Sequence, residues 1–119
     1  MTLDFAQAFT DRLRADLKTA MQARARDEAG VLRALIGAVD NAQSVPLDPA
    51  FKPAHVGTFG DSANEVPRKV LGQADIDALL QREIDERLHA AAEIERAGRP
   101  DRSEVLRAEA AIVARYRAA

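Results

Sequence analysis

Apolar side chains recur at helical spacing through most of the chain. Between about residues 4 and 25 they fall on every fourth position, at Phe5, Phe9, Leu13, Leu17 and Met21. A second series, from about 28 to 43, includes Leu32, Leu35, Ile36 and Val39. Spacings of three and four residues put side chains on one face of an α-helix, whereas a strand would alternate. The polar run 26–28 between the two series predicts a short link and an antiparallel helical hairpin.

The second half of the chain repeats this pattern after an irregular stretch. Residues 44–72 contain four of the five prolines and three of the six glycines, which predicts a long loop. Helical spacing returns from about 73 to 97 and stops at Gly98, a residue suited to the left-handed conformation that ends helices. Pro100 is tolerated as a first helical residue and opens a fourth helix. We therefore predict one all-α domain of four helices over residues 1–119.

Composition limits the core and the cellular setting. Hydrophobic residues make up 47% of the chain, but 25 residues are alanine, so the core is expected to be thin. The net charge of −2 excludes a generally cationic protein, and the lack of cysteine excludes disulfides and thiolate chemistry. The amino terminus lacks the pattern of a signal peptide, and no apolar run is long enough to span a bilayer. We expect a cytoplasmic protein without a membrane anchor.

Several charged residues lie where the helical pattern calls for apolar ones. Glu83 and Arg87 fall within the apolar arc of the third helix, Glu109 falls on the apolar side of the fourth, and Arg33 lies on the flank of the second. An unpaired buried charge costs several kcal/mol. These four residues are therefore expected either to pair with one another or to line a polar groove between the last three helices. In such a groove Arg33 and Arg87 would offer planar forks to a phosphate or carboxylate.

Residues that could carry catalysis are scarce. Glu86 and His89 have the spacing of a di-metal helix, but the only other histidine, His55, lies in the predicted loop without a matching glutamate. Ser44, Ser62 and Ser103 stand in no recognisable nucleophile turn. We expect no catalytic residue, no metal site and no cofactor. Phe51 and Phe59 in the loop either pack back on the helices or anchor a protein partner.

Charge is unevenly spread along the helices. Residues 11–37 carry six basic side chains, including Arg14 and Lys18, whereas acidic residues outnumber basic ones between 73 and 97. This asymmetry either orients the domain on RNA, with Arg14 and Lys18 as phosphate contacts, or reflects solvated helix faces.

The order of several segments resembles the GatB/YqeY family. These segments are 14–24 (RADLKTAMQAR), 32–42 (LRALIGAVDNA), 66–68 (VPR), 79–87 (LLQREIDER), 95–101 (ERAGRPD) and 106–110 (LRAEA). The resemblance covers nearly all of the chain outside the loop and is to a short form with the amino-terminal helical domain only. It implies an all-helical domain related to the helical part of the B subunit of the tRNA-dependent amidotransferase. Similar appendages on glutaminyl-tRNA synthetases are associated with tRNA affinity.

Three functions follow as expectations from these observations. The first is a non-catalytic YqeY-like domain that assists tRNA-dependent amidation or aminoacylation by binding tRNA or an enzyme that handles tRNA. The second is a protein-interaction module without an RNA role, docking through Phe51 and Phe59. The third, implied by family similarity only, is a carbon–nitrogen ligase with glutamine as amido-N donor.

Overall fold

The computed structural model describes residues 4–44 and 69–117, and these ranges are almost entirely helical. The helices are α1 (Phe5–Gln22), α2 (Arg26–Gln43), α3 (Gln73–Arg96) and α4 (Pro100–Ala114). The predicted all-α class with four helices is confirmed. Most of the predicted loop, residues 45–68, lies outside the described residues. No helix in the described ranges is long and apolar enough to cross a membrane.

Local sequence explains where three of the helices begin. The Asp4 carboxylate accepts a hydrogen bond from the Gln7 backbone N–H at 3.2 Å and so caps α1. At the start of α3, the Asp75 carboxylate accepts one from the Gly72 backbone N–H at 2.9 Å. Pro100 is the first residue of α4, where its missing N–H would have had no helical partner.

The link between α1 and α2 differs from the prediction. The polar run 26–28 forms the first turn of α2, where Asp27 and Glu28 face the positive end of the helix dipole. The turn itself is at residues 23–25, and it is closed by two hydrogen bonds. The Ala25 N–H donates to the Ala20 carbonyl at 2.9 Å, and the Arg24 N–H donates to the Met21 carbonyl at 3.1 Å. This is the Schellman arrangement that ends many helices.

The same arrangement ends α3. The Gly98 N–H donates to the Glu95 carbonyl at 3.0 Å and the Arg99 N–H donates to the Ile94 carbonyl at 3.1 Å. Gly98 has a φ of +85°, as its predicted role requires. Arg24, at the equivalent position after α1, has a φ of +58°. An arginine therefore occupies a backbone conformation that favours glycine.

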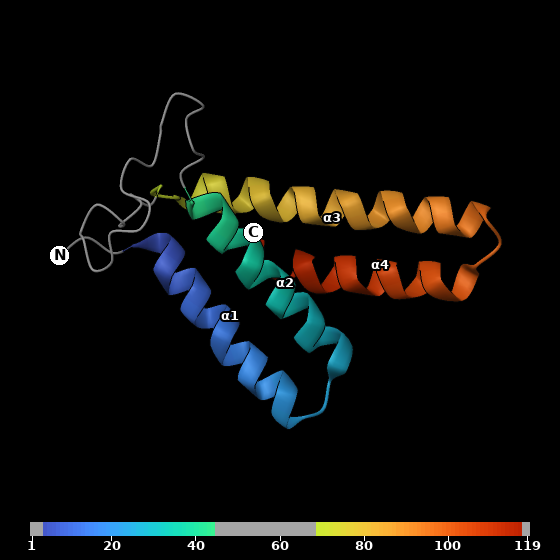
Figure 1. Cartoon of the computed structure of the whole chain (residues 1–119), viewed down its shortest axis with the longest axis horizontal. Helices are drawn as coiled ribbons and strands as arrows, with labels where there is room; N and C mark the ends of the chain where they lie inside the picture. Colours follow the sequence, from blue (N-terminus) through green and yellow to red (C-terminus); the bar gives the residue numbers. More distant parts are fainter. Residues whose placement is uncertain (1–3, 45–68, 118–119) are drawn as a thin grey trace, which may run out of the picture.

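The four helices form two antiparallel hairpins, α1–α2 and α3–α4, which pack together (Figure 1). The core lies where they meet and includes Leu13, Leu32, Leu35, Val39, Ile76, Leu80 and Val113, all fully buried. The far end of the α3–α4 hairpin extends past α2 in Figure 1. One face of the α1–α2 hairpin is thus covered by the other two helices, and its opposite face is open.

The apolar series of α1 does not stay in the core along its whole length. Phe9 and Leu13 are buried, but Phe5 is 39% exposed and Met21 is 53% exposed. Each step of four residues turns about 40° past a full helical turn. Phe5 and Met21 therefore lie about 80° to either side of Leu13. A strict fourth-residue spacing must leave the core at both ends.

Candidate functional site

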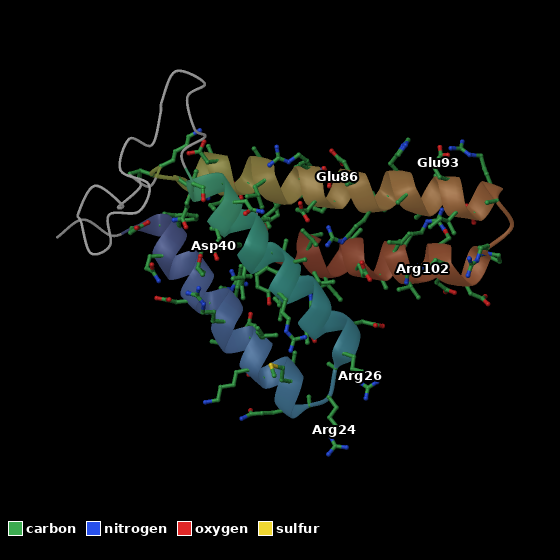
Figure 2. The ribbon with its side chains drawn as sticks, viewed as in Figure 1. Arg24, Arg26, Asp40, Glu86, Glu93 and Arg102 are labelled. Carbon is green, nitrogen blue, oxygen red and sulfur yellow. The ribbon has the colours of Figure 1, made fainter. Side chains whose placement is uncertain are left out.

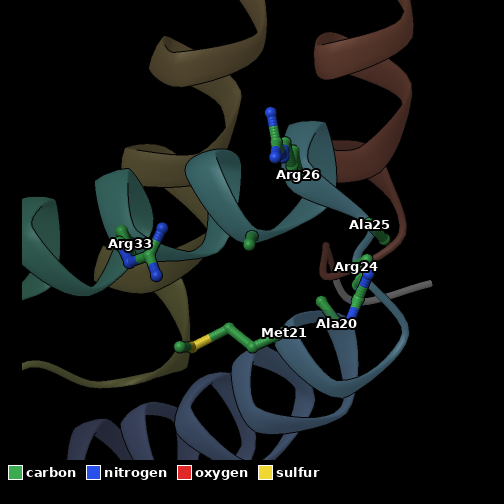
Figure 3. Close-up of a pocket in the computed structure, with 7 residues that line it drawn as sticks. Ala20, Met21, Arg24, Ala25, Arg26 and Arg33 are labelled. Atoms are coloured by element: carbon green, nitrogen blue, oxygen red, sulfur yellow. The ribbon is translucent and has the colours of Figure 1, made fainter.

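The open face of the α1–α2 hairpin contains a pocket of about 580 Å³ at the end near the link. We call it the arginine pocket; its lining residues are Ala20, Met21, Arg24, Ala25, Arg26, Ala29 and Arg33. They come from the last turn of α1, the link and the first two turns of α2 (Figure 3). Among the described residues, the lining comes from this single hairpin.

The pocket combines an apolar floor with a cationic rim. Ala20 and Ala29 are buried, and their small side chains leave the hollow between the helices. Met21, which the sequence pattern placed in the core, instead lies in the pocket (Figure 3). The only charged groups in the lining are the guanidinium groups of Arg24, Arg26 and Arg33.

These three arginines have no acidic partner in the part of the chain that the structure describes. All three are exposed, and none forms an ion pair or hydrogen bond there. Each guanidinium presents five N–H donors in a planar fork that matches a phosphate or carboxylate. The pocket is therefore suited to an anion.

A second, smaller pocket of about 220 Å³ lies further along the same face. We call it the polar pocket; it is lined by Asp4, Gln7, Thr10, Arg14, Asp40, Gln43, Lys69 and Val70. Arg14 precedes Met21 by seven residues on α1, and Asp40 follows Arg33 by seven on α2. Seven residues make about two helical turns, so the two pockets share a face and lie about 10 Å apart along it.

Lys18 lies between the two pockets. It is four residues after Arg14 and three before Met21, and it is exposed. On the facing helix the corresponding position is Gly37, where an added Cβ would meet no atom within 4 Å. We define the basic face as the residues that line the two pockets together with Lys18 and Gly37. Both predicted RNA contacts, Arg14 and Lys18, lie on it.

The basic face has an excess of positive charge that the whole chain lacks. Its exposed cations are Arg14, Lys18, Arg24, Arg26, Arg33 and Lys69, and its carboxylates are Asp4 and Asp40. Helix α3 has seven acidic residues and three arginines. In Figure 2, Arg24 and Arg26 project at the link of the first hairpin, whereas Glu86 and Glu93 lie along α3. The excess of positive charge is thus confined to the basic face, and α3 carries an excess of negative charge.

Three of the four predicted inward charges meet between α3 and α4. Arg87 Nη1 lies 2.9 Å from Glu83 Oε1 and also donates to the Glu83 carbonyl at 3.1 Å. Arg87 Nε lies 3.5 Å from Glu109 Oε1, an ion-pair distance without a hydrogen bond. The side chains of Arg87, Glu83 and Glu109 are only 15%, 19% and 24% exposed. One guanidinium held between two carboxylates is a structural ion-pair cluster.

Arg33 does not join this cluster. It was expected beside Arg87 in a groove shared by the last three helices, but it lies on the open face of α2 and lines the arginine pocket. The physical reason is that a flank position of a helix can face either neighbour, and α2 has helix α1 on one side and α4 on the other. Phe51 and Phe59, the predicted docking residues, lie outside the described residues.

A polar network around Tyr116 was not predicted from the sequence. The Tyr116 hydroxyl donates to Asp16 Oδ2 at 2.6 Å, and the Arg12 guanidinium lies 4.7 Å from the centre of the tyrosine ring. The pKa of the Tyr116 hydroxyl is raised to about 12, chiefly because the group is buried. The hydrogen bond to Asp16 and the negative charge of the Asp16 carboxylate raise this pKa further. Beside it, Arg115 pairs with Glu28 at 2.7 Å. These bonds join the end of α4 to α1 and α2.

The hollow beside Tyr116 contrasts with the arginine pocket. It has a volume of about 340 Å³, and Asp16, Glu28, Arg115 and Tyr116 in its lining bond to one another as described above. Its polar groups are thus already satisfied within the protein. Among the described residues there is also no group of three or more side chains that could hold a metal ion. The three guanidinium groups of the arginine pocket, by contrast, have no partner among the described residues.

Comparisons of the chain with models of protein families, with curated proteins and with solved structures find no match.

Proposed function

We propose that this chain is a non-catalytic helical domain that binds tRNA through the basic face of its α1–α2 hairpin. The observation that carries the proposal is the arginine pocket, in which Arg24, Arg26 and Arg33 line one hollow without an acidic partner among the described residues. In nucleic acids, the anions that arginine guanidinium groups bind are the backbone phosphates. The resemblance to the GatB/YqeY family supports tRNA as the RNA and an associated amidation or aminoacylation enzyme as the setting.

A net charge of −2 is compatible with RNA binding when the charges are separated. The basic face carries six cations and two carboxylates, and α3 carries the opposite excess. An RNA would be attracted to the basic face and repelled from α3. This separation orients the RNA and limits the contact to one side of the domain.

The exposed cations of the basic face favour RNA over the protein-interaction module suggested by the sequence. That alternative depends on Phe51 and Phe59, which lie outside the described residues. The basic face offers six exposed cations as its main feature, and such a surface fits the closely spaced phosphates of a nucleic acid. A charged partner protein remains the outcome to consider if RNA fails to bind.

The test is the affinity of the purified chain for total tRNA, measured by fluorescence anisotropy at about 50 and 200 mM salt. The double variant Arg26→Ala/Arg33→Ala should bind more weakly and reduce the slope of log K against log salt by about 1.4 to 1.8. Arg14→Ala/Lys18→Ala should act in the same direction. The matched control is Arg99→Ala/Arg102→Ala, which removes two exposed arginines near the other link.

The control should leave the affinity close to that of the unchanged chain. If no tRNA binds even at low salt, RNA recognition by this chain is refuted. If the control weakens binding as much as the basic-face variants do, the effect is one of total charge and the assigned face is wrong.

A further inference from the structure

We infer that the arginine pocket holds one unpaired nucleotide of the RNA, with its base on the apolar floor and its phosphate on the arginine rim. This inference rests on the proposed function and specifies which part of an RNA the site takes. The observation behind it is the hollow itself. Contacts to backbone phosphates need only a cationic surface. The hollow is open to solvent and has a volume of about 580 Å³, which is large enough for one nucleobase.

The lining has the two chemistries that a nucleotide presents. Four of the seven lining residues are apolar, namely Ala20, Met21, Ala25 and Ala29, and the other three are arginines. A nucleobase has flat faces that pack on apolar groups or on a guanidinium plane, and its phosphate is an anion. A simple anion would use the rim and leave the floor uncovered.

Met21 is the residue that distinguishes a nucleotide from a bare phosphate. Its side chain is 53% exposed and lies within the pocket, although exposed large apolar side chains are few in the described residues. A thioether packs favourably against aromatic rings. A base that entered the pocket would cover Met21 and would lie beside guanidinium groups able to stack on its other face.

Only an unpaired nucleotide can reach this floor. In a helical RNA the faces of the bases are stacked on one another, and proteins meet chiefly the phosphates and the 2′-hydroxyls. Nucleotides in loops and bulges can turn their bases outward. The site should therefore prefer RNA with a loop over a continuous duplex, while the remaining cations of the basic face bind both through phosphates.

The experiment compares two RNAs of equal length and charge, one a stem with an unpaired loop and the other a blunt duplex. The unchanged chain should bind the loop RNA about two- to tenfold more tightly, which is the range expected for contact of a thioether with one aromatic ring. Met21→Ala should remove most of this preference by lowering the affinity for the loop RNA towards that for the duplex. Leu88→Ala, an exposed leucine on α3, is the matched control and should change neither affinity.

Nuclear magnetic resonance gives a readout that does not depend on a variant. The chain has two methionines, Met1 and Met21, so labelling of methionine methyl groups gives two signals, and Met21→Ala identifies the second. A base packed on Met21 should shift its methyl signal through the ring current. Loop RNA should cause this shift, and inorganic phosphate or duplex RNA should not.

The outcomes separate this inference from the proposed function. Equal binding of loop and duplex RNA, or a Met21 signal that loop RNA leaves unshifted, would overturn the nucleotide pocket and leave tRNA binding through phosphates intact. Failure of both RNAs to bind at low salt would overturn both proposals. Loss of loop preference in Met21→Ala with duplex binding retained supports both.

Discussion

Replacing Arg24 by glycine should stabilise the fold and weaken RNA binding at the same time. Arg24 occupies the left-handed position of the turn after α1, with a φ of +58°. For a residue with a side chain this conformation costs roughly 1–2 kcal/mol, because Cβ crowds the following carbonyl. Glycine has no Cβ and adopts the same φ without strain. Its greater freedom in the unfolded chain offsets roughly 0.4–1 kcal/mol of the gain.

The difference between these terms gives a net increase of about 0.8 kcal/mol in the free energy of unfolding. For a domain of this size such an increase raises Tm by about 3–6 °C. Thermal denaturation followed by circular dichroism measures it. Arg24→Ala removes the guanidinium but keeps Cβ, so it should leave Tm close to that of the unchanged chain. Both variants should bind tRNA more weakly, because each removes one arginine from the pocket.

The matched turn after α3 supplies the reverse experiment. Gly98 has a φ of +85°, and a Cβ added there would meet no atom within 4 Å. Gly98→Ala therefore tests backbone strain alone, and it should lower Tm by an amount similar to the rise in Arg24→Gly. The reasoning is refuted if Arg24→Gly lowers Tm, or if Arg24→Ala raises it as much as Arg24→Gly does.

Two further predictions concern the groups that hold the helices together. Arg87→Ala should lower the free energy of unfolding by about 2–3 kcal/mol, because it leaves Glu83 and Glu109 partly buried without their cation. The affinity for tRNA should not change. A loss of affinity at equal folded fraction would contradict a structural role for Arg87. The Tyr116 hydroxyl should titrate at about pH 12 in the folded chain. Because folding favours the protonated hydroxyl, its contribution to stability is complete below pH 10 and should be lost as pH rises from 10 to 12. It is the only tyrosine, so the absorbance of tyrosinate measures this titration directly, and midpoint values near 10 in the folded chain would refute the bond to Asp16. Tyr116→Phe should abolish this dependence of stability on pH.

Structural features that depend only on residues close together in the sequence, such as helices, helix ends and ion pairs within one helix, could be predicted. The spacing of apolar residues is sufficient to predict α1, α2 and α3, because the residues that these helices bury are nearly all apolar. Gly98 is recognisable as a helix end because glycine combines with the following Pro100. Glu83 and Arg87 are four residues apart on the apolar side of α3, so their ion pair follows from helix geometry.

Features that depend on packing between helices could not be predicted. Asp16 and Tyr116 are 100 positions apart, and nothing in either local sequence selects the other as a partner. The turn at residues 23–25 has no glycine or proline to indicate it, so the polar run just after it was interpreted as the link. Arg33 was assigned to the wrong neighbours because periodicity shows that a residue is on a flank but not which helix lies beside that flank.

The candidate site arises where the apolar pattern of α1 departs from the core. Five apolar residues at fourth positions turn through about 160° from first to last, so they cannot all face one neighbour on a straight helix. The core takes Phe9 and Leu13 and leaves Met21 at the surface. The residues that follow could have covered it with apolar side chains; the chain instead places Arg24 and Arg26 there, one of them in a strained conformation. An exposed methionine bordered by arginines that have no acidic partner among the described residues contributes little to stability. That combination is what we would expect of a surface selected for a ligand with both an apolar face and a negative charge.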